Sequence, residues 1–429
     1  MMAAKTLRIG MVIYGDLTHD SRVQREANSL AEAGHQVTLF SLAGSREQIP
    51  TLDSRIAIIV RAPTKGTVIP GSPSPFRQSR RGSRLRRIVD RVEWLRGYTR
   101  NLQAWGRTIT STAVGIDVWH AHDFAGLVAV GSSIGRGPAL IYDVHDLFVE
   151  TGTAARLPGI MRWALRQYER HLIGQVDLVV AVNQPLATIV RDRYEPRSMI
   201  VVHNCPLRWT PPEVRPDLIR EATGIPVGAP IILYHGLLSA NRGLDQLTAA
   251  MLEPGLERAH LALMGYGELA GSLSELARDP RYEGRLHILD AVQPALLLPW
   301  VASADVGAVA MPHASLNLFI STPNKLFECL SAGTPVVVSN FPAVQDIVID
   351  DPLGPLGAVC DPSVVSDVAR AIRSILSLDD ATRTDLRRRC ATAAYERWNW
   401  ETEVARLIAA YDHLAADASV TRTSLETSR

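Results

Sequence analysis

The stretch MPHASLNLFISTPNKLFECLSAGTPVVVSN, residues Met311 to Asn340, decides the fold of this chain. It follows ADVGAVA at residues 304–310, a short apolar run typical of a buried strand. Thr322 and Pro323 predict the N-cap and first residue of a helix, and Gly333 marks its end. The run PVVVS at residues 335–339 then predicts a second buried strand. Strand, helix and strand in close succession indicate one unit of a parallel α/β sheet.

Two charged residues of this helix carry chemistry. Lys325 lies in the first turn, where the helix dipole disfavours a cation by roughly 0.3–1 kcal/mol unless an anion binds there. The free N–H groups of a helix start, together with a lysine, form a phosphate site. Glu328 lies one turn deeper on the same face, where a carboxylate accepts hydrogen bonds from a pair of vicinal hydroxyls. This combination suits a ribosyl diphosphate.

A second interpretation stays open beside it. Lys325 and Glu328 are three residues apart, so they also fit a solvated surface ion pair. Such a pair stabilises a helix by about 0.2–0.5 kcal/mol. Lysine is rare in this chain, since only Lys5, Lys65 and Lys325 occur among its 45 basic residues. A lysine retained at a helix start in so arginine-rich a chain favours a role for the compact ammonium.

The run STPNKLFECLSAGTPVVVS resembles the donor-binding segment of the GT-B fold nucleotide-sugar glycosyltransferases, in particular the retaining glycosyltransferase family 4. The resemblance implies that Glu328 holds the nucleotide ribose, with Pro323, Asn324 and Lys325 beside it in the donor site. The family usually carries a second glutamate eight positions earlier, and here that position is Ile320. A subgroup with a Pro-Asn-Lys-Leu-Phe-Glu run lacks it too.

A second segment, HGLLSANRGLDQL at residues 235–247, resembles the loop with which the same family neutralises the donor diphosphate. The resemblance places Gly236 and Arg242 in the donor site, with Arg242 at the family's lysine position. The family's arginine position holds Leu237, so one charge is missing, and we expect Lys325 to compensate.

The N-terminal part predicts the opening of a Rossmann-like half: strand Leu7–Ile13, a loop, helix Arg22–Ala33 and strand Gln36–Ser41. The stretch GDLTHDSRVQREANSLAEAGHQV resembles the N-terminal signature of the same glycosyltransferases. The resemblance implies that Gly15, Asp20 and Arg22 face the acceptor side of an interdomain cleft. For Asp20 the alternative is simple capping of the helix.

Histidines and aspartates gather where two strands end. Strand IDVWH at residues 116–120 leads to His122, and YDVHD at residues 142–146 contains His145. Ligands bind at the carboxyl ends of strands in open α/β sheets. The family resemblance implies that His122 contacts the acceptor or the transferred sugar, so we predict His122, Asp20 and His145 as catalytic residues. A metal site is the alternative; without HExxH spacing or a carboxylate-rich set, we expect none.

Length and composition indicate the number of domains, the class of partner and the cellular location. With 429 residues and 46% hydrophobic content the chain predicts two domains, and its net charge of +1 gives no reason to expect nucleic acid as a partner. The four cysteines, with no CxxC spacing, indicate reduced thiols, and no apolar run is long enough for a signal peptide or a membrane span, so we expect a cytoplasmic protein. The segment 204–230 contains six prolines and predicts the domain boundary.

We therefore predict an α/β protein with two Rossmann-like, doubly wound domains facing a cleft, the GT-B arrangement. The domains are residues 1–204, joined by a returning C-terminal helix at 401–416, and residues 205–400, followed by a disordered tail at 417–429. The resemblance implies transfer of a sugar from a nucleotide-diphosphate sugar to an acceptor hydroxyl with retention of configuration. The acceptor, a glycan, a lipid-linked or a small molecule, is left open.

No Asp-x-Asp motif occurs, so we expect no metal and no other cofactor. Two other functions are left open because Ile320 and Leu237 replace charged family positions. One is a sugar-nucleotide-binding protein without transfer activity, and the other is a GT-B sugar-nucleotide epimerase.

The stretch RRGSRLRRIVDRVEWLRGYTR, residues 80–100, predicts a basic amphipathic helix. Its apolar stripe either packs on the sheet or lies on an anionic membrane, which would make the protein membrane-peripheral and suit a lipid-linked acceptor.

If the helix binds lipid, changing Arg84, Arg86, Arg87 and Arg91 to serine abolishes sedimentation with phosphatidylserine vesicles, and added salt weakens it. Equal sedimentation of wild type and variant would leave the helix as ordinary packing.

Overall fold

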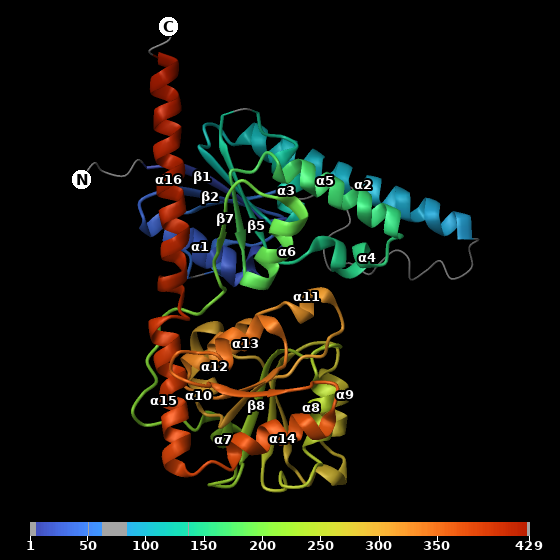
Figure 1. The fold of residues 1–429 in the computed structure, drawn as a ribbon, viewed down its shortest axis with the longest axis vertical. Coiled ribbons are helices and arrows are strands. Elements are labelled where there is room, and N and C mark those ends of the chain that lie inside the picture. The colour runs from blue at the N-terminus through green and yellow to red at the C-terminus, as the bar shows by residue number, and fades with distance from the viewer. Residues whose placement is uncertain (1–5, 50, 62–83, 136, 427–429) are drawn as a thin grey trace. The chain divides into compact units, whose positions relative to one another are not determined.

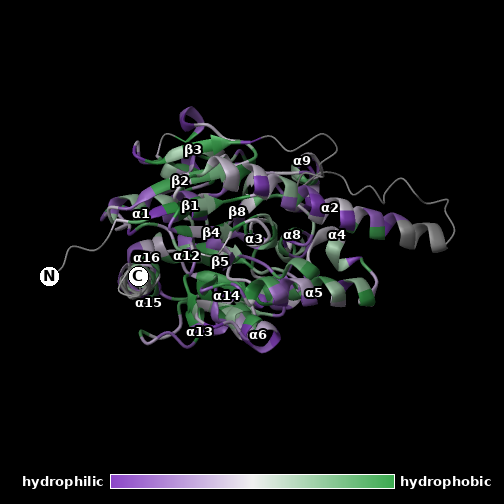
Figure 2. Ribbon diagram, turned by 90° about the horizontal axis from the view of Figure 1, so that it is seen from above, coloured by the Kyte–Doolittle hydropathy of each residue, from purple (hydrophilic) through white to green (hydrophobic). Residues whose placement is uncertain are grey.

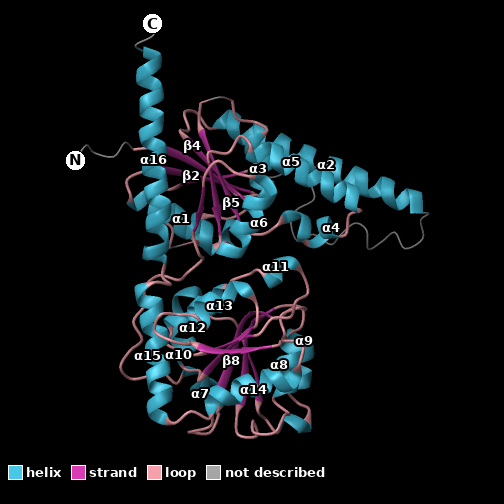
Figure 3. Cartoon of the chain, in the orientation of Figure 1, coloured by secondary structure: helices cyan, strands magenta, loops and turns pink. Residues whose placement is uncertain are grey.

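The computed structural model of the chain describes residues 6–49, 51–61, 84–135 and 137–426. Compact packing divides it into unit 1, residues 1–202 with 404–429, and unit 2, residues 203–403. For comparison, the domains expected from the sequence are residues 1–204 with 401–416, and residues 205–400. Each unit contains one sheet with helices packed around it (Figures 1 and 3).

Unit 1 contains seven strands: β1 (Arg8–Val12), β2 (Gln36–Ser41), β3 (Ala57–Val60), β4 (Val118–His122), β5 (Ala139–Val144), β6 (Leu178–Ala181) and β7 (Met199–Val201). Its α-helices are α1 (Ser21–Glu32), α2 (Arg84–Thr112), α3 (Asp123–Gly131), α4 (Gly152–Ala155), α5 (Gly159–Ile173), α6 (Gln184–Tyr194) and most of α16 (Trp400–Glu426). Short 3-10 helices lie at η1 (Leu17–His19), η2 (Arg46–Gln48) and η4 (Phe148–Glu150).

The seven strands pair in parallel in the order β3-β2-β1-β4-β5-β6-β7. The central strands are buried, as a parallel sheet covered on both faces requires. Apart from polar residues such as the two histidines of β4 they are largely apolar, and Figure 2 shows much of the sheet in the green of hydrophobic residues. The strand order reverses between β1 and β4. In doubly wound sheets the carboxyl ends of the strands at this switch point form the ligand site.

Unit 2 contains six strands: β8 (Ile231–Leu237), β9 (His260–Tyr266), β10 (Leu286–Leu289), β11 (Val306–Val309), β12 (Val336–Ser339) and β13 (Gly357–Cys360). Its α-helices are α7 (Leu218–Thr223), α8 (Leu244–Ala250), α9 (Ala270–Leu276), α10 (Leu297–Ala302), α11 (Leu316–Phe319), α12 (Asn324–Ser331), α13 (Pro342–Val348), α14 (Val365–Leu376) and α15 (Asp380–Glu396). The 3-10 helices are η5 (Pro280–Tyr282) and η6 (Pro294–Leu296).

The second sheet repeats the plan of the first. Its strands pair in parallel in the order β10-β9-β8-β11-β12-β13, so its switch point lies between β8 and β11. The predicted fold class, two Rossmann-like doubly wound domains, is confirmed. The end of β8 with the loop after it, and the segment between β11 and β12, contain every residue predicted to bind the donor.

Helix α12 differs from the prediction at its start. Pro323 is the N-cap instead of the first helical residue, because its ψ of 144° is extended, and the helix begins at Asn324. The helix is eight residues long, shorter than the stretch from Thr322 to Gly333 indicated. Lys325 remains in the first turn, as predicted.

The C-terminal helix α16 begins in unit 2 and from Val404 onward belongs to unit 1, where Leu407 and Tyr411 are buried. It extends to Glu426, past residue 416, where we expected a disordered tail to begin. Residues 427–429 lie outside the described residues.

The basic stretch forms the N-terminal part of α2. The side chains of residues 84–89 lie outside the described residues, so the lipid hypothesis stays a prediction. Within the described parts of the chain, none of the helices is both long enough and apolar enough to cross a membrane.

Helix α2 lies close to α3, and alanine substitutions at two glycines of α2 test this close contact. A Cβ atom on Gly106 would lie 1.8 Å from the carbonyl oxygen of Ala129, whereas one on Gly97 of the same helix would meet nothing within 4 Å. Gly97→Ala should stabilise the protein by up to about 1 kcal/mol through helix propensity. Gly106→Ala should destabilise it by about 1–3 kcal/mol through overpacking. Urea unfolding measures both, and equal stabilities would contradict the close approach.

Candidate functional site

The donor-side residues of unit 2 lie around one buried ammonium. Lys325, on α12, is only 9% exposed, and its Nζ atom lies 3.6 Å from the centroid of the Tyr234 ring on β8. No described residue forms a hydrogen bond with this Nζ atom. The aromatic face favours the cation, but it is no anionic partner.

Burial is the main electrostatic influence on this lysine. It disfavours the charged form and, with the nearby positive charge of Arg242, lowers the pKa of Lys325 to about 7. The guanidinium of Arg242 itself has only a weak contact, 4.0 Å from Nη1 to the sulfur of Met311. Lys325 and Arg242 therefore lie near each other, and the ammonium of Lys325 is buried between α12 and β8 without a hydrogen-bond partner among the described residues. An anion bound here would satisfy both.

Glu328 does not pair with Lys325, so the hypothesis of a surface ion pair between them is wrong. Its Oε2 atom lies 2.8 Å from Nε2 of His235 on β8, and its side chain keeps 22% exposure. A buried histidine therefore orients this carboxylate and leaves part of it accessible. His235 was not predicted from the sequence. It lies 93 residues from Glu328 along the chain, and only tertiary packing brings the two side chains together.

The other predicted donor residues lie on the same elements. Gly236 has φ of +118° at the end of β8, a conformation that favours glycine, and a Cβ atom on Gly265 would lie 1.8 Å from its carbonyl oxygen. Asn324 is exposed, and its Oδ1 atom accepts a hydrogen bond of 2.8 Å from Asn204. Pro323 and Asn324 thus lie at the start of α12, which carries Lys325 and Glu328, and Gly236 lies on β8 next to His235.

Unit 1 holds a buried network at the carboxyl ends of β4 and β5. Arg22, only 3% exposed, donates Nε and Nη2 to the two carboxylate oxygens of Asp143, at 2.7 and 3.0 Å. Its Nη1 atom donates to the carbonyl of Val202, and its Nε atom lies 3.1 Å from Glu26. Arg22, expected to face the cleft, instead neutralises buried carboxylates because its helix begins beside β5.

His122 also lies inside this network and is fully buried. Its Nδ1 atom lies 3.5 Å from both Asp143 and the Nε2 atom of His145, and its ring stacks on His120 at 4.5 Å. His120 in turn contacts the hydroxyl of Tyr411 through Nδ1, at 2.9 Å. The sequence indicated the histidines, but Glu26 and Tyr411 come from α1 and α16 and had no local signal.

His145 is the histidine of this group with exposed surface, 20% of its side chain. Its Nδ1 atom lies 3.4 Å from Asp123 and its Nε2 atom 3.4 Å from Asp143. Burial alone would lower the pKa of His145, but these two carboxylates raise it to about 10, so the ring is a cation at neutral pH. Arg22 likewise holds the pKa of Asp143 well below its usual range, although burial opposes this.

Two predicted residues of the N-terminal loop have other roles in the structure. Asp20 caps α1, because its carboxylate accepts a hydrogen bond of 3.0 Å from the N–H of Val23, in agreement with the capping alternative. Gly15 lies in the loop after β1, and its carbonyl accepts a hydrogen bond from the N–H of Leu42. Contact of either residue with an acceptor stays a prediction.

Comparison with known families assigns both units. A family described as Glycosyltransferase Family 4 matches residues 21–205, and one described as Glycosyl transferases group 1 matches residues 229–378. Together they cover most of the chain.

Two curated relatives agree with these matches. The D-inositol 3-phosphate glycosyltransferase of Xylanimonas cellulosilytica is 25% identical over 90% of this chain and 89% of its own length. The GDP-mannose-dependent alpha-(1-6)-phosphatidylinositol dimannoside mannosyltransferase of Mycobacterium tuberculosis is 32% identical over 43% of this chain and 45% of its own.

Solved structures share the fold. Sucrose-phosphate synthase from Thermosynechococcus elongatus superposes with a TM-score of 0.69 at 17% identity, covering 96% of this chain and all of that one. HepE from Anabaena, in complex with UDP and glucose, gives a TM-score of 0.66 at 16% identity, covering 95% of this chain and all of that one.

The two sheets, the sites at their switch points and these similarities define a glycosyltransferase of the GT-B fold. Within that class, the chain belongs to the family 4 type, as its resemblance implied.

Asp20 allows helix capping to be separated from a role in the reaction. Asp20→Asn should keep the stability of wild type, since both residues cap well, whereas Asp20→Ala should lose about 1 kcal/mol in urea unfolding. If the carboxylate also contacts the acceptor, Asp20→Asn lowers turnover despite its intact stability. Wild-type turnover of Asp20→Asn would assign Asp20 to capping alone.

Proposed function

We propose that the protein transfers a sugar from a nucleotide-diphosphate sugar to an acceptor hydroxyl, with retention of the anomeric configuration. The observation that carries the proposal is the buried, unpaired ammonium of Lys325, with Arg242 nearby and the oriented carboxylate of Glu328 one turn away. A donor molecule has a diphosphate for the two cations and ribose hydroxyls for the carboxylate.

The donor would lie against β8 and α12. Its diphosphate would interact with Lys325, Arg242 and the free N–H groups at the start of α12, which the helix dipole makes favourable for anions. Glu328, held by His235, would accept hydrogen bonds from the ribose. Similar proteins support this choice of donor, since HepE has been solved with UDP-glucose and the mycobacterial relative is named as GDP-mannose-dependent.

The chemistry follows from these charges. As the bond between the anomeric carbon and the diphosphate oxygen breaks, the acceptor oxygen bonds to that carbon on the same face. The acceptor's proton passes to the departing diphosphate, so no protein nucleophile is required. Lys325 and Arg242 would stabilise the charge that develops on the leaving group, in a place that burial partly shields from water.

Unit 1 would supply the acceptor side, where we predicted His122, Asp20 and His145. His122 has no exposed surface and contacts His145, so we assign it the positioning of that ring. His145, cationic and partly exposed, is then the group best suited to contact an acceptor or the transferred sugar. A lipid-linked acceptor would fit contact of α2 with an anionic membrane.

Incubation with UDP-glucose and GDP-mannose, with and without an extract containing acceptors, tests the function. The proposal expects nucleoside diphosphate release that rises with acceptor, and a product whose anomeric configuration, read by NMR, matches the donor. Binding without release would support a protein without transfer activity, and conversion of the sugar without an acceptor would support an epimerase. Either result would overturn the proposal.

Lys325 makes donor binding dependent on pH. Its pKa of about 7 in the free protein should rise when the diphosphate binds, so binding above pH 7 takes up a proton. Donor affinity is then full below pH 7 and falls by up to about tenfold per pH unit above it. Calorimetry with a nucleotide-diphosphate sugar in buffers of different ionisation enthalpy measures the uptake.

The matched control is Lys325→Gln, which removes the titrating group and keeps an amide at the same place. Its donor affinity should be weaker at pH 6.5 and nearly independent of pH up to 9. Parallel pH profiles for wild type and variant would show that Lys325 is not the anion-binding cation.

A further inference from the structure

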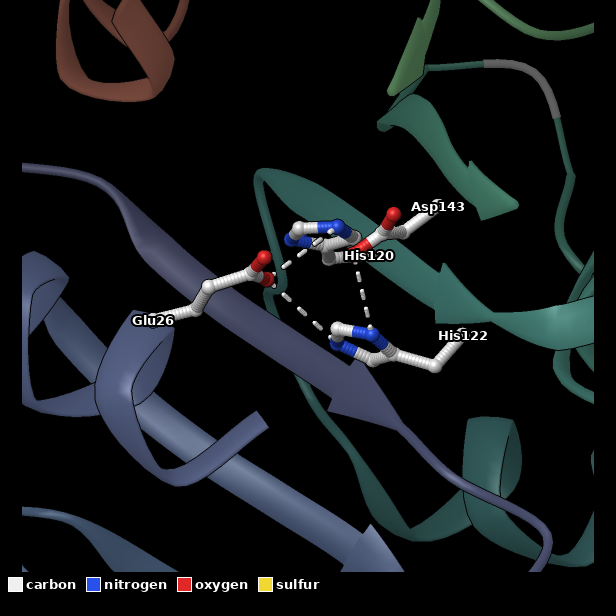
Figure 4. A group of neighbouring side chains, drawn as sticks. All are labelled: Glu26, His120, His122 and Asp143. Carbon is white, nitrogen blue, oxygen red and sulfur yellow. Dashed lines mark ion pairs between the residues drawn. The ribbon is translucent and has the colours of Figure 1, made fainter. Parts of the chain in front are cut away.

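Three buried side chains of unit 1 point at one another without being bonded. Figure 4 shows Glu26 of α1 facing His120 and His122 of β4. The Oε2 atom of Glu26 lies 3.7 Å from Nε2 of His120 and 3.9 Å from Nε2 of His122. The two histidines are two residues apart on one strand, so the alternation of side chains places both on the same face.

These three facing atoms lack hydrogen-bond partners among the described residues. All three residues are fully buried, so no bulk water reaches these atoms. An unsatisfied buried polar atom lowers the stability of the folded state, and here three of them share one place. At 3.7 and 3.9 Å, neither histidine nitrogen is within hydrogen-bonding distance of Glu26.

The opposite ring nitrogens are already occupied. Nδ1 of His120 contacts the Tyr411 hydroxyl at 2.9 Å, and Nδ1 of His122 faces the Asp143 carboxylate at 3.5 Å. Nδ1 of His122 lies equally close, 3.5 Å, to Nε2 of His145. With the ring proton of each histidine on Nδ1, the lone pair of Nε2 would be directed at Glu26. Metal-binding histidines are typically held in this way, by a carboxylate or another polar group on the second nitrogen.

We propose that Glu26, His120 and His122 bind a zinc ion through Oε2 and the two Nε2 atoms. Zinc bonds of about 2.0–2.2 Å in a tetrahedral arrangement place neighbouring ligand atoms roughly 3.3–3.5 Å apart. The two Glu26–histidine distances need therefore shorten by only a few tenths of an ångström. The histidine rings, stacked with centroids 4.5 Å apart, would turn so that both Nε2 lone pairs meet at the ion. A water molecule would complete the four ligands, with Asp143 and Tyr411 as outer partners.

The ligand set determines the choice of metal. Two imidazoles and one carboxylate suit zinc and other first-row transition ions, whereas Mg²⁺ and Ca²⁺ prefer oxygen ligands alone. The positive charge of Arg22, 3.1 Å from Glu26, is offset by Asp143, which it contacts through two bonds. The ion would link α1 to β4 and, through Tyr411, to α16.

The ligand spacing explains why the sequence did not indicate this site. The pattern HAH at residues 120–122 supplies two ligands at strand spacing, and the third lies almost a hundred residues earlier, on a helix. Motifs for zinc sites on helices, such as HExxH, do not detect it. The proposal concerns unit 1 alone and does not depend on the donor site of unit 2.

The test measures metal in the full-length protein, purified from cells supplied with zinc and then dialysed. Elemental analysis should find about one zinc per chain, and a chelator should lower the melting temperature. Glu26→Gln and His120→Gln should each lose the zinc. Tyr411→Phe, which keeps all three ligands, should weaken zinc binding by about 10–100-fold in a competition with a chromophoric chelator.

Unit 2 offers a matched control, since His260 and His287 also approach each other, with Nδ1 and Nε2 3.0 Å apart. His287→Gln should keep the full zinc content. Circular dichroism would show whether each variant is folded. Wild type without zinc, or zinc retained by a folded Glu26→Gln variant, would overturn the proposal.

Discussion

The proposed donor site depends on a lysine that the fold buries without giving it an anionic partner among the described residues. Lys325 could have been an apolar residue at little cost to packing, since its neighbours are the ring of Tyr234 and the interior of unit 2. A buried cation without a partner lowers stability, and the lowered pKa of Lys325 is the sign of that penalty. A chain that retains it gains something only when an anion arrives.

The fold explains where such groups gather. Both sheets reverse their strand order beside the first strand, and at that point the neighbouring loops leave in opposite directions. In unit 2, β8 presents Tyr234, His235 and Gly236 there, facing α12. In unit 1, β4 presents its two histidines there, facing α1. Two similar sheets thus hold the proposed anion site and a network of histidines and carboxylates.

The sequence predicted the fold well and the sites in part. Buried runs such as QVTLFS specify parallel strands by themselves, and β2 has the predicted bounds, Gln36–Ser41. The start of α12 was off by one residue because proline fits both the cap and the first helical position. Lys325 and Glu328 could be singled out because the chemistry of a helix start is local, and their role in donor binding stays a prediction.

The contacts that the sequence did not predict share one cause, which is that the contacting residues are far apart along the chain. His235 on Glu328, Glu26 beside His122 and Tyr411 on His120 each come from another element, and only tertiary packing brings them together. His122 is a residue whose position was predicted but whose surroundings were not. Its place at the end of a strand was predicted, but its complete burial depends on α1, β5 and α16 together.

The most direct test of this account is the affinity of Glu328→Gln for the nucleotide that wild type binds, measured by calorimetry beside the melting temperature of each protein. A carboxylate that accepts hydrogen bonds from two ribose hydroxyls contributes on the order of 1.5–3 kcal/mol per bond. The account predicts a loss of at least tenfold in affinity with little change in melting temperature. Unchanged affinity would contradict it and leave Glu328 as a structural partner of His235.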